Sequence, residues 1–456
     1  MNIYLHVETS FRELDSKLLL AVLAAAKGHQ VIVSRLVEII HGLKNDALAP
    51  GIFHTKSLTP DNIKMERHQK IIDKGSKVTS FDEESGFFNE NYDQFAVDRY
   101  SDLTIEQSSA AFGWGSEDTN TLKRIYSKNS DKIHKTGSPR MDLWKSYFLD
   151  YWVDPKGMPK KPFLLIASNI FCTQTRMFHE FYKFYKDAGY FQRNPNLFKD
   201  LFYSTAEDYK KLYAFIDAIK YLAKNNNGYD IVLRPHPRDN IEAWKIFLEG
   251  VRNVHIIRQD SITAWVKNTF AVMHNGCTTA LEATISGKPV LTYSPFKTEY
   301  DGKLFNTLGY NLKSKEELLI KANELFKFEK IKEQKKKEVQ ISELISKKLY
   351  IDDNELAAEK ILKVWESLED KSLSKSNNWT KFYWLLKIMN LKGALHKIAT
   401  KLFPNKFKSA KENNKFPSLD ESEICERVSR LRHILKIEKK IECKLLSDRT
   451  ILIRSY

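Results

Sequence analysis

The stretch "IYLHVETSFRELDSKLLLAVLAAAKGHQVIVS", residues 3–34, decides the fold class, because it predicts a strand, a helix and a second strand in one short run. Its ends, "IYLHV" and "QVIVS", are short apolar runs typical of buried strands, and "ELDSKLLLAVLAAA" between them has helical spacing. The helix is predicted to end at Lys27 and Gly28, since glycine commonly follows a helix C-terminus. A βαβ unit requires a parallel sheet, so an α/β fold is expected.

A second series of apolar runs follows the first and has helical segments between its members. These runs are "FLLIAS", "YDIVL", "VHIIR", "FAVMH" and "PVLTY". The Pro-, Gly- and Lys-rich stretch at residues 153–162 predicts a linker between the two series. We therefore expect an α/β protein with two Rossmann-like, doubly wound domains, residues 1–152 and 162–350, that face each other across a cleft. A helical, basic extension is expected over residues 351–456.

Length and composition support more than one domain and narrow the class of protein. The chain has 456 residues, of which 42% are hydrophobic, more than a single core normally holds. Its four cysteines lack the spacing of a disulfide framework or a structural zinc site. The N-terminal residues lack the pattern of a signal peptide, and no apolar run is long enough for a spanning helix. A cytoplasmic protein is expected, and the net charge of +15 predicts an anionic partner.

The stretch "LRPHPRDN", residues 233–240, places positive and titratable side chains directly behind an apolar run. Ligands of doubly wound folds bind beyond the carboxyl ends of the strands, so these side chains are expected to border the cleft. Two prolines would hold the histidine in a fixed direction. A surface turn with solvated charges is the alternative. The catalytic candidate here is His236, and the nucleotide- or phosphate-binding candidates are Arg234, Pro237 and Arg238.

A second candidate element is "AVMHNGCTTALEATISGKPVLTY", residues 271–293. The pattern predicts a strand, an Asn-Gly turn, and a helix that begins near two threonines and ends at Gly287. The free N–H groups of a helix N-terminus, with hydroxyl groups beside them, suit a phosphate. Ordinary capping of the helix by Thr278 is the alternative. The nucleotide- or phosphate-binding candidates here are His274, Asn275, Gly276, Thr278, Thr279 and Glu282.

A third element is the acidic run in "SFDEESGFF", residues 80–88, where Asp82, Glu83 and Glu84 follow a predicted strand. Adjacent carboxylates are expected to raise one another's pKa and could supply a base or a nucleophile near neutral pH. An acidic, solvated loop is the alternative. The glycine-bearing turns "GWG" and "TGSPRMD" are weaker signals in the same domain. Arg12, Gly137 and Arg140 are further candidates for the cleft.

These stretches together resemble bacterial surface-carbohydrate biosynthesis proteins of the two-Rossmann, glycosyltransferase B architecture. The combination of an acidic motif, a His-Pro motif and a Ser/Thr motif is similar to that of sialyltransferases and Kdo transferases, which use CMP-activated sugars. By this resemblance Glu84 or a neighbour matches the acidic motif, His236 and Pro237 the His-Pro motif, and Thr278 with Thr279 the hydroxyl motif. One departure is Ser85, which separates the carboxylates from Gly86, so all three carboxylates remain candidates.

The resemblance implies that an acidic ulosonic sugar moves from a CMP donor onto a surface glycan such as lipopolysaccharide O-antigen or capsule. Charge builds on the departing phosphate, and a histidinium or arginine can stabilise it without a metal. The sequence has no Asp-x-Asp pair of the kind that often holds a divalent ion. No metal and no cofactor besides the donor are therefore expected. The alternatives are a CDP-polyol phosphotransferase, a sugar-nucleotide 2-epimerase and a non-catalytic assembly subunit.

The stretch 371–416 differs from the rest of the chain, with eleven lysines, one acidic residue and interleaved aromatic side chains. This composition is typical of an interfacial helix on anionic lipid. It predicts a peripheral protein on the inner face of the bacterial inner membrane, which acts on a lipid-linked or surface glycan acceptor. A helix that packs on the catalytic domain with its lysines in water is the alternative. Nucleic acid is not expected, because no nucleic-acid-binding motif accompanies the charge.

Overall fold

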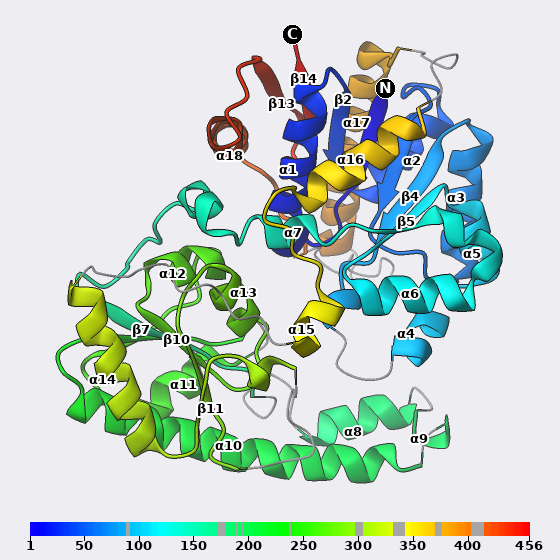
Figure 1. Ribbon diagram of the computed structural model, residues 1–456. Coiled ribbons are helices and arrows are strands. Elements are labelled where there is room, and N and C mark those ends of the chain that lie inside the picture. The colour runs from blue at the N-terminus through cyan, green and yellow to red at the C-terminus, as the bar shows by residue number, and fades with distance from the viewer. Residues whose placement is uncertain are drawn as a thin grey trace. The chain divides into compact units, whose positions relative to one another are not determined.

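The computed structural model contains two compact units (Figure 1). The first unit comprises Met1–Leu143 and Ile345–Tyr456, and the second comprises Trp144–Leu344. The structure describes residues 1–87, 92–170, 178–187, 190–193, 195–236, 239–296, 304–331, 343–369, 376–402 and 415–456. No helix among these residues has both the length and the apolar character that a bilayer crossing requires.

The first unit is built on an eight-stranded sheet in the order β13-β14-β2-β1-β3-β4-β5-β6. The strands are β1 (Asn2–His6), β2 (Gln30–Ser34), β3 (Ile52–Thr55), β4 (Lys77–Phe81), β5 (Ala110–Gly113), β6 (Ile133–Lys135), β13 (Ile441–Ser447) and β14 (Thr450–Ser455). The helices are α1 (Ser10–Ala26), α2 (Leu36–Lys44), α3 (Asn62–Asp73), α4 (Tyr92–Arg99), α5 (Asp102–Gln107), α6 (Ser116–Ile125), α7 (Pro139–Asp142), α15 (Glu343–Lys348), α16 (Ala357–Ser367), α17 (Trp379–Leu402) and α18 (Glu421–Ile434).

The central part of this sheet is parallel and doubly wound. All five residues of β1 are buried, and β1 pairs in parallel with β2 on one side and with β3 on the other. The chain thus moves from β1 to β2 and then returns across β1 to β3, which makes the β1/β3 boundary a topological switch point. Polar residues that follow β1 and β3 therefore lie where ligands of such sheets bind.

The second unit is built on a six-stranded sheet in the order β12-β11-β10-β7-β8-β9, and its strand pairs are parallel. The strands are β7 (Phe163–Ala167), β8 (Asp230–Arg234), β9 (Val254–Ile256), β10 (Ala271–His274), β11 (Val290–Tyr293) and β12 (Tyr310–Leu312). The helices are α8 (Phe178–Asp187), α9 (Tyr190–Arg193), α10 (Leu197–Asn225), α11 (Ile241–Phe247), α12 (Ile262–Asn268), α13 (Thr279–Ile285) and α14 (Lys315–Ile331). This strand order is that of dinucleotide-binding sheets, with the switch point between β7 and β10.

The predicted fold class, α/β with two Rossmann-like, doubly wound domains, is confirmed. The opening βαβ unit is present as β1, α1 and β2. The buried leucines and alanines of α1 cover the sheet, and Gly28 adopts a positive φ of 92° directly after the helix. The hydrophobic runs of the second series form β7 to β11, because a parallel strand covered on both faces needs a continuous apolar sequence.

The C-terminal part differs from the expected helical extension over residues 351–456, because it belongs to the first unit and contains two strands. Within the predicted helical extension, α18 ends at Ile434 and the chain then forms β13. Strand β14 pairs antiparallel with β2, with Ile451 opposite Val33. An unpaired edge of β2 would expose a row of backbone N–H and C=O groups, so β14 satisfies groups that a helix could not reach. The segment from Ile345 also lies in the first unit, not in the predicted second domain.

This packing predicts that the C-terminal strand is essential to the stability of the first unit. Ile453 on β14 is fully buried, and Ile453→Ala is expected to destabilise the first unit by about 2–5 kcal/mol through lost burial and a residual cavity. Hydrogen exchange of the β1, β2 and β14 amides would measure the effect. Lys444→Ala on the exposed side of β13 is the control and should change protection little. Equal protection in both variants would show that β14 is dispensable.

Candidate functional site

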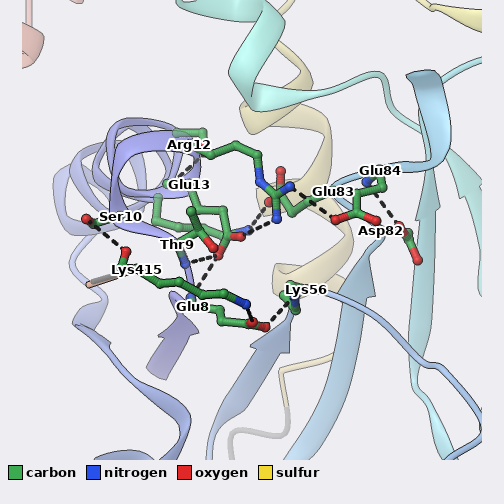
Figure 2. Close-up of polar contacts among 12 residues, drawn as sticks. Glu8, Thr9, Ser10, Arg12, Glu13, Lys56, Asp82, Glu83, Glu84 and Lys415 are labelled. Carbon is green, nitrogen blue, oxygen red and sulfur yellow. Dashed lines mark hydrogen bonds and ion pairs between the residues drawn. The ribbon is translucent and has the colours of Figure 1, made fainter. Parts of the chain in front are cut away.

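The three consecutive carboxylates that follow β4 have different environments (Figure 2). Asp82 and Glu83 are buried, whereas the Glu84 side chain is 50% exposed. Each pairs with its own cation: Asp82 with Arg99, Glu83 with Lys17, and Glu84 with Arg12. The run therefore does not act as one cluster of like charges.

Asp82 is held by a two-point contact with Arg99. Arg99 Nε donates to Asp82 Oδ2 at 2.8 Å, and Nη2 donates to Oδ1 at 3.0 Å. The Glu84 backbone N–H also donates to Asp82 Oδ1, at 3.1 Å. Burial raises the pKa of Asp82 above its usual value, Arg99 opposes that rise, and the charge of Glu84 adds the smallest of these effects. The expected mutual pKa increase of neighbouring carboxylates is thus a minor contribution beside burial.

Glu83 and Lys17 form an ion pair inside the first unit. Lys17 Nζ lies 2.9 Å from Glu83 Oε1, and the two side chains are only 2% and 3% exposed. Lys17 belongs to α1, so the pair ties this helix to the loop after β4. Both charges are shielded from solvent, which makes this pair a structural contact and removes Glu83 from reach of a dissolved substrate.

Arg12, on the first turn of α1, connects the exposed carboxylate to a buried one. Its Nη1 lies 3.1 Å from Glu84 Oε1 and its Nη2 2.9 Å from Glu13 Oε1 (Figure 2). Glu13 Oε2 accepts the backbone N–H groups of Glu8 at 2.8 Å and Thr9 at 3.3 Å. Glu13 thereby satisfies donors at the start of α1, where the Thr9 side chain makes no capping bond. The Arg12 guanidinium is thus held by buried Glu13 through Nη2 and contacts exposed Glu84 through Nη1.

The β1/β3 switch point itself carries an ion-pair cluster that the sequence interpretation missed. Glu8 follows β1 and pairs with Lys56, which follows β3, and with Lys415 at 2.7 Å (Figure 2). Burial favours the neutral acid, but the two lysines outweigh it and lower the pKa of Glu8 to about 2. The sequence did offer a signal, because Glu8 and Lys56 each lie within two residues of the end of a buried strand. The carbonyl of Lys415 also accepts the Ser10 N–H at 2.8 Å.

The glycine-bearing turns of the first unit hold a later segment of the same unit. The Tyr350 N–H donates to the Trp114 carbonyl at 2.6 Å, within the "GWG" turn. Gly137 has a φ of 79°, and a Cβ there would lie 2.3 Å from the Tyr350 carbonyl oxygen. The predicted cleft residue Gly137 therefore has a packing role. Arg140 lies on α7, where its N–H donates to Ser138 Oγ at 3.3 Å.

In the second unit, a buried aspartate fixes the backbone of the His-Pro motif. Asp239 Oδ2 accepts Ser168 Oγ at 2.7 Å, the His236 N–H at 3.0 Å and Trp244 Nε1 at 3.3 Å. Ser168 follows β7, so these bonds join the ends of two neighbouring strands. His236 is partly exposed beside this group. The candidates Pro237 and Arg238 lie outside the described residues.

Arg234, which the sequence predicts to bind phosphate, donates to backbone carbonyls of its own unit. Its guanidinium contacts the carbonyl oxygen of Gln259 and that of Asp260, the latter at 3.0 Å, and lies 5.7 Å from the centre of the Trp265 ring. Burial lowers the pKa of Arg234 to about 10. The side chain therefore supports the loop before α12.

His274 at the end of β10 is fully buried and cannot supply a positive charge to a phosphate. Its Nε2 lies 2.8 Å from Thr292 Oγ1, and its Nδ1 accepts the Cys277 N–H at 3.3 Å. Since Thr292 Oγ1 donates to the Leu308 carbonyl at 2.7 Å, the imidazole carries its proton on Nε2. Burial lowers the pKa of His274 to about 3, so the ring is neutral at ordinary pH.

The turn after β10 bridges the β7/β10 switch point. Gly276, with a φ of 67°, donates its N–H to Asn306 Oδ1 at 2.7 Å. Its carbonyl accepts Asn169 Nδ2 at 3.2 Å, and Asn169 lies just after β7. Asn275 Nδ2 donates to the Tyr293 carbonyl at 2.8 Å. These contacts hold the backbone of the turn at the position where a doubly wound sheet binds its ligand.

The start of α13 presents one exposed hydroxyl group. Thr278 is exposed, and its side chain makes no capping hydrogen bond. The alternative that Thr278 simply caps α13 is therefore wrong. Thr279 is buried, with its Oγ1 3.2 Å from Cys277 Sγ. Glu282 is buried on the same helix. Thr278 therefore remains the accessible member of the predicted hydroxyl motif.

Within the described part of the chain, no group of three or more His, Cys, Asp or Glu side chains is arranged to hold a metal ion. The cations near the acidic run are protein side chains, namely Arg12, Lys17 and Arg99. Each carboxylate of the acidic run is thus paired with one side-chain cation.

No protein-family model matches the chain, and no curated protein matches it. Solved structures similar to it include the putative UDP-N-acetylglucosamine 2-epimerase from Listeria monocytogenes, at 13% identity and a TM-score of 0.49, covering 80% of this chain and 96% of that chain. The UDP-GlcNAc 2-epimerase from Neisseria meningitidis, bound to UDP-GlcNAc, is 13% identical with a TM-score of 0.44, over 80% and 100%. The wall teichoic acid polymerase TagF is 11% identical with a TM-score of 0.40, over 70% and 74%.

The unequal burial of the acidic run predicts unequal effects of amide substitutions on stability. Glu83→Gln should destabilise the first unit by about 3–5 kcal/mol, because it leaves the charge of Lys17 buried without its partner. Glu84→Gln should change stability by less than about 0.5 kcal/mol. Hydrogen exchange of α1 and β4 would measure both. The double change Lys17→Met with Glu83→Leu should restore protection, because it removes both buried charges. If Glu83→Gln and Glu84→Gln gave equal protection, the structural role of the pair would be contradicted.

Proposed function

We propose that this chain is an enzyme that acts on a nucleotide sugar in the synthesis of a surface carbohydrate. The proposal rests on the second sheet, which has the strand order of dinucleotide-binding sheets and a switch point between β7 and β10. The hydrogen bond from Asn169 to the Gly276 carbonyl joins the loops that follow these two strands. Sheets of this order bind nucleotides at that position. The second unit is therefore the proposed nucleotide-binding unit. His236 after β8 and Thr278 after β10 are accessible polar residues at this edge of the sheet, together with Asn169.

Glu84 is the proposed general base. It is the exposed member of the acidic run, and its Oε1 lies 3.1 Å from Arg12 Nη1, a contact that fixes the direction of the carboxylate. Asp82 and Glu83 are buried and each is engaged with a cation, so we assign them to support. This assignment reduces the three candidates from the sequence to one proton acceptor and two positioning residues.

Two reactions of a nucleotide sugar fit these roles. In the first, Glu84 deprotonates an acceptor hydroxyl while an acidic ulosonic sugar leaves CMP, with a lipid-linked or surface glycan as the acceptor. In the second, Glu84 removes the proton at C2 of a UDP sugar as UDP leaves C1, and a proton from solvent then adds to the opposite face of C2 as UDP adds back to C1, so that the 2-epimer forms without any acceptor. A 2-epimerase activity is named for the Listeria monocytogenes and Neisseria meningitidis proteins. Phosphotransfer from a CDP-polyol needs a base in the same role.

The nucleotide preference separates these reactions. A ligand that binds only the folded state raises stability by about 2.7 kcal/mol at a hundredfold excess over its Kd, so thermal unfolding with CMP, CDP, UDP and GDP reports the choice. Stabilisation by CMP would favour transfer of an ulosonic sugar. Stabilisation by CDP would favour transfer of a polyol phosphate, and stabilisation by UDP would favour 2-epimerisation. Asn169→Ala, which removes the contact to Gly276, should weaken the response to the preferred nucleotide. If none of the four nucleotides stabilises the chain, the proposal is wrong.

Substitution of Glu84 tests the catalytic assignment. Glu84→Gln should lower turnover by about 10²–10⁴-fold, because general-base catalysis contributes that much, while the thermal shift with nucleotide stays unchanged. Glu66→Gln on α3 is the matched control, since Glu66 is an exposed carboxylate that also pairs with one cation. Turnover should survive EDTA, because the sequence has no Asp-x-Asp pair of the kind that often holds a divalent ion. Near-normal turnover of Glu84→Gln would exclude Glu84 as the base.

A further inference from the structure

The helix α17 is attached to the first unit through one of its faces. Phe382 and Leu386 are buried in the same hydrophobic core as residues of β1, β3 and α2. Just before the helix, Asn377 accepts the Ala49 N–H at 2.8 Å and donates to Asn2 Oδ1 at 3.0 Å. Tyr4 also donates to Asn377, at 3.0 Å. The first half of α17 is therefore held firmly against the sheet.

The opposite face of α17 is apolar and exposed. Trp384, Ile388, Leu391 and Leu395 follow one another at intervals of four, three and four residues, which places them in one stripe along the helix. Trp384 is 59% exposed and Leu391 62%. Because α-helical residues advance by about 100° each, this stripe lies across the helix from Phe382. An amphipathic helix packed on a core normally has a polar outer face, and this one does not.

Lysines border the exposed stripe. Lys381 and Lys392 lie along one side of it, and Lys387 lies along the other, where its Nζ is 4.7 Å from the centre of the Tyr383 ring and 5.3 Å from that of Trp384. The helix contains five lysines and no acidic residue. A surface with an apolar centre and an unbalanced positive border complements an anionic lipid surface, in which acyl chains lie beneath negative headgroups.

We propose that the outer face of α17, defined by Trp384, Ile388, Leu391 and Leu395 with its bordering lysines, docks on the surface of an anionic lipid bilayer. The helix lies in the plane of the headgroups, with the four apolar side chains below them and the lysines at phosphate level. A protein partner would need a matching acidic rim, whereas anionic headgroups supply that charge everywhere. This inference stands apart from the proposed reaction, because docking requires no substrate.

Removal of the tail is not a suitable test. Truncation after about residue 370 would delete Phe382, Leu386 and the whole of β14, which belong to the core and the sheet of the first unit. Of the basic stretch 371–416, the structure describes residues 376–402 together with 415 and 416. Point substitutions on the exposed face leave the buried face intact.

The experiment is flotation of the full chain with vesicles of phosphatidylglycerol and phosphatidylcholine in varied proportions. Trp384→Ser combined with Leu391→Ser should lower partitioning by at least about tenfold at every salt concentration, because salt does not screen apolar burial. Lys387→Gln combined with Lys392→Gln should lower it by about fivefold per lysine at low salt, and only on anionic vesicles. Both variants should keep the wild-type thermal unfolding.

Two control variants match these changes elsewhere on the surface. Tyr213→Ser removes an exposed aromatic residue of α10, and Lys439→Gln with Lys440→Gln removes two exposed lysines before β13; neither should alter partitioning. Equal flotation of the α17 variants and the wild type would overturn the proposal. So would sedimentation data in which the Trp384 variant loses self-association yet floats normally, because the face would then join two copies of the chain.

Discussion

The ion pair between Lys17 and Glu83 is the contact on which the candidate site of the first unit depends. Lys17 is carried by the helix that follows β1, and Glu83 by the loop that follows β4, so the pair sets the position of that loop against the start of α1. Asp82 and Glu84 flank Glu83 in the same loop, where Arg99 holds the first and Arg12 contacts the second. A buried pair is costly to break, because the remaining charge would lack solvent as well as its partner.

Burial decides what each carboxylate of the acidic run can do. Asp82, Glu83 and Glu84 are neighbours in sequence and chemically similar, yet one is held by Arg99 and one by Lys17, and the third reaches solvent beside Arg12. Much of the positive charge of the first unit is engaged in this way, as Lys56 and Lys415 are by Glu8. The lysines that border the outer face of α17 differ, because no acidic residue of that helix neutralises them.

The sequence predicted the elements of the fold whose signal is local. The continuous apolar runs of β1, β2 and β7 are visible without any knowledge of their partners, and so are the strand ends at which Asp82 and His236 lie. Strand β13 was missed because its apolar residues alternate with charges, as in residues 440–444, and β14 was missed because its partner β2 is about 400 residues away. The contacts of Arg234 and His274 could not be predicted for a related reason, since the sequence does not reveal which distant carbonyl or hydroxyl group each side chain meets.

The pairing of β14 with β2 makes the second unit an insertion within the first. During synthesis, residues 144–344 emerge and can fold before the last strand of the first unit has been made. The sheet from β1 to β6 must meanwhile persist with the outer edge of β2 unpaired, a state in which strands associate readily with other chains. The two units therefore differ in when they can finish folding during translation. The inserted unit can fold early, whereas the unit that carries the acidic run can complete its sheet only after residues 450–455 have been synthesised.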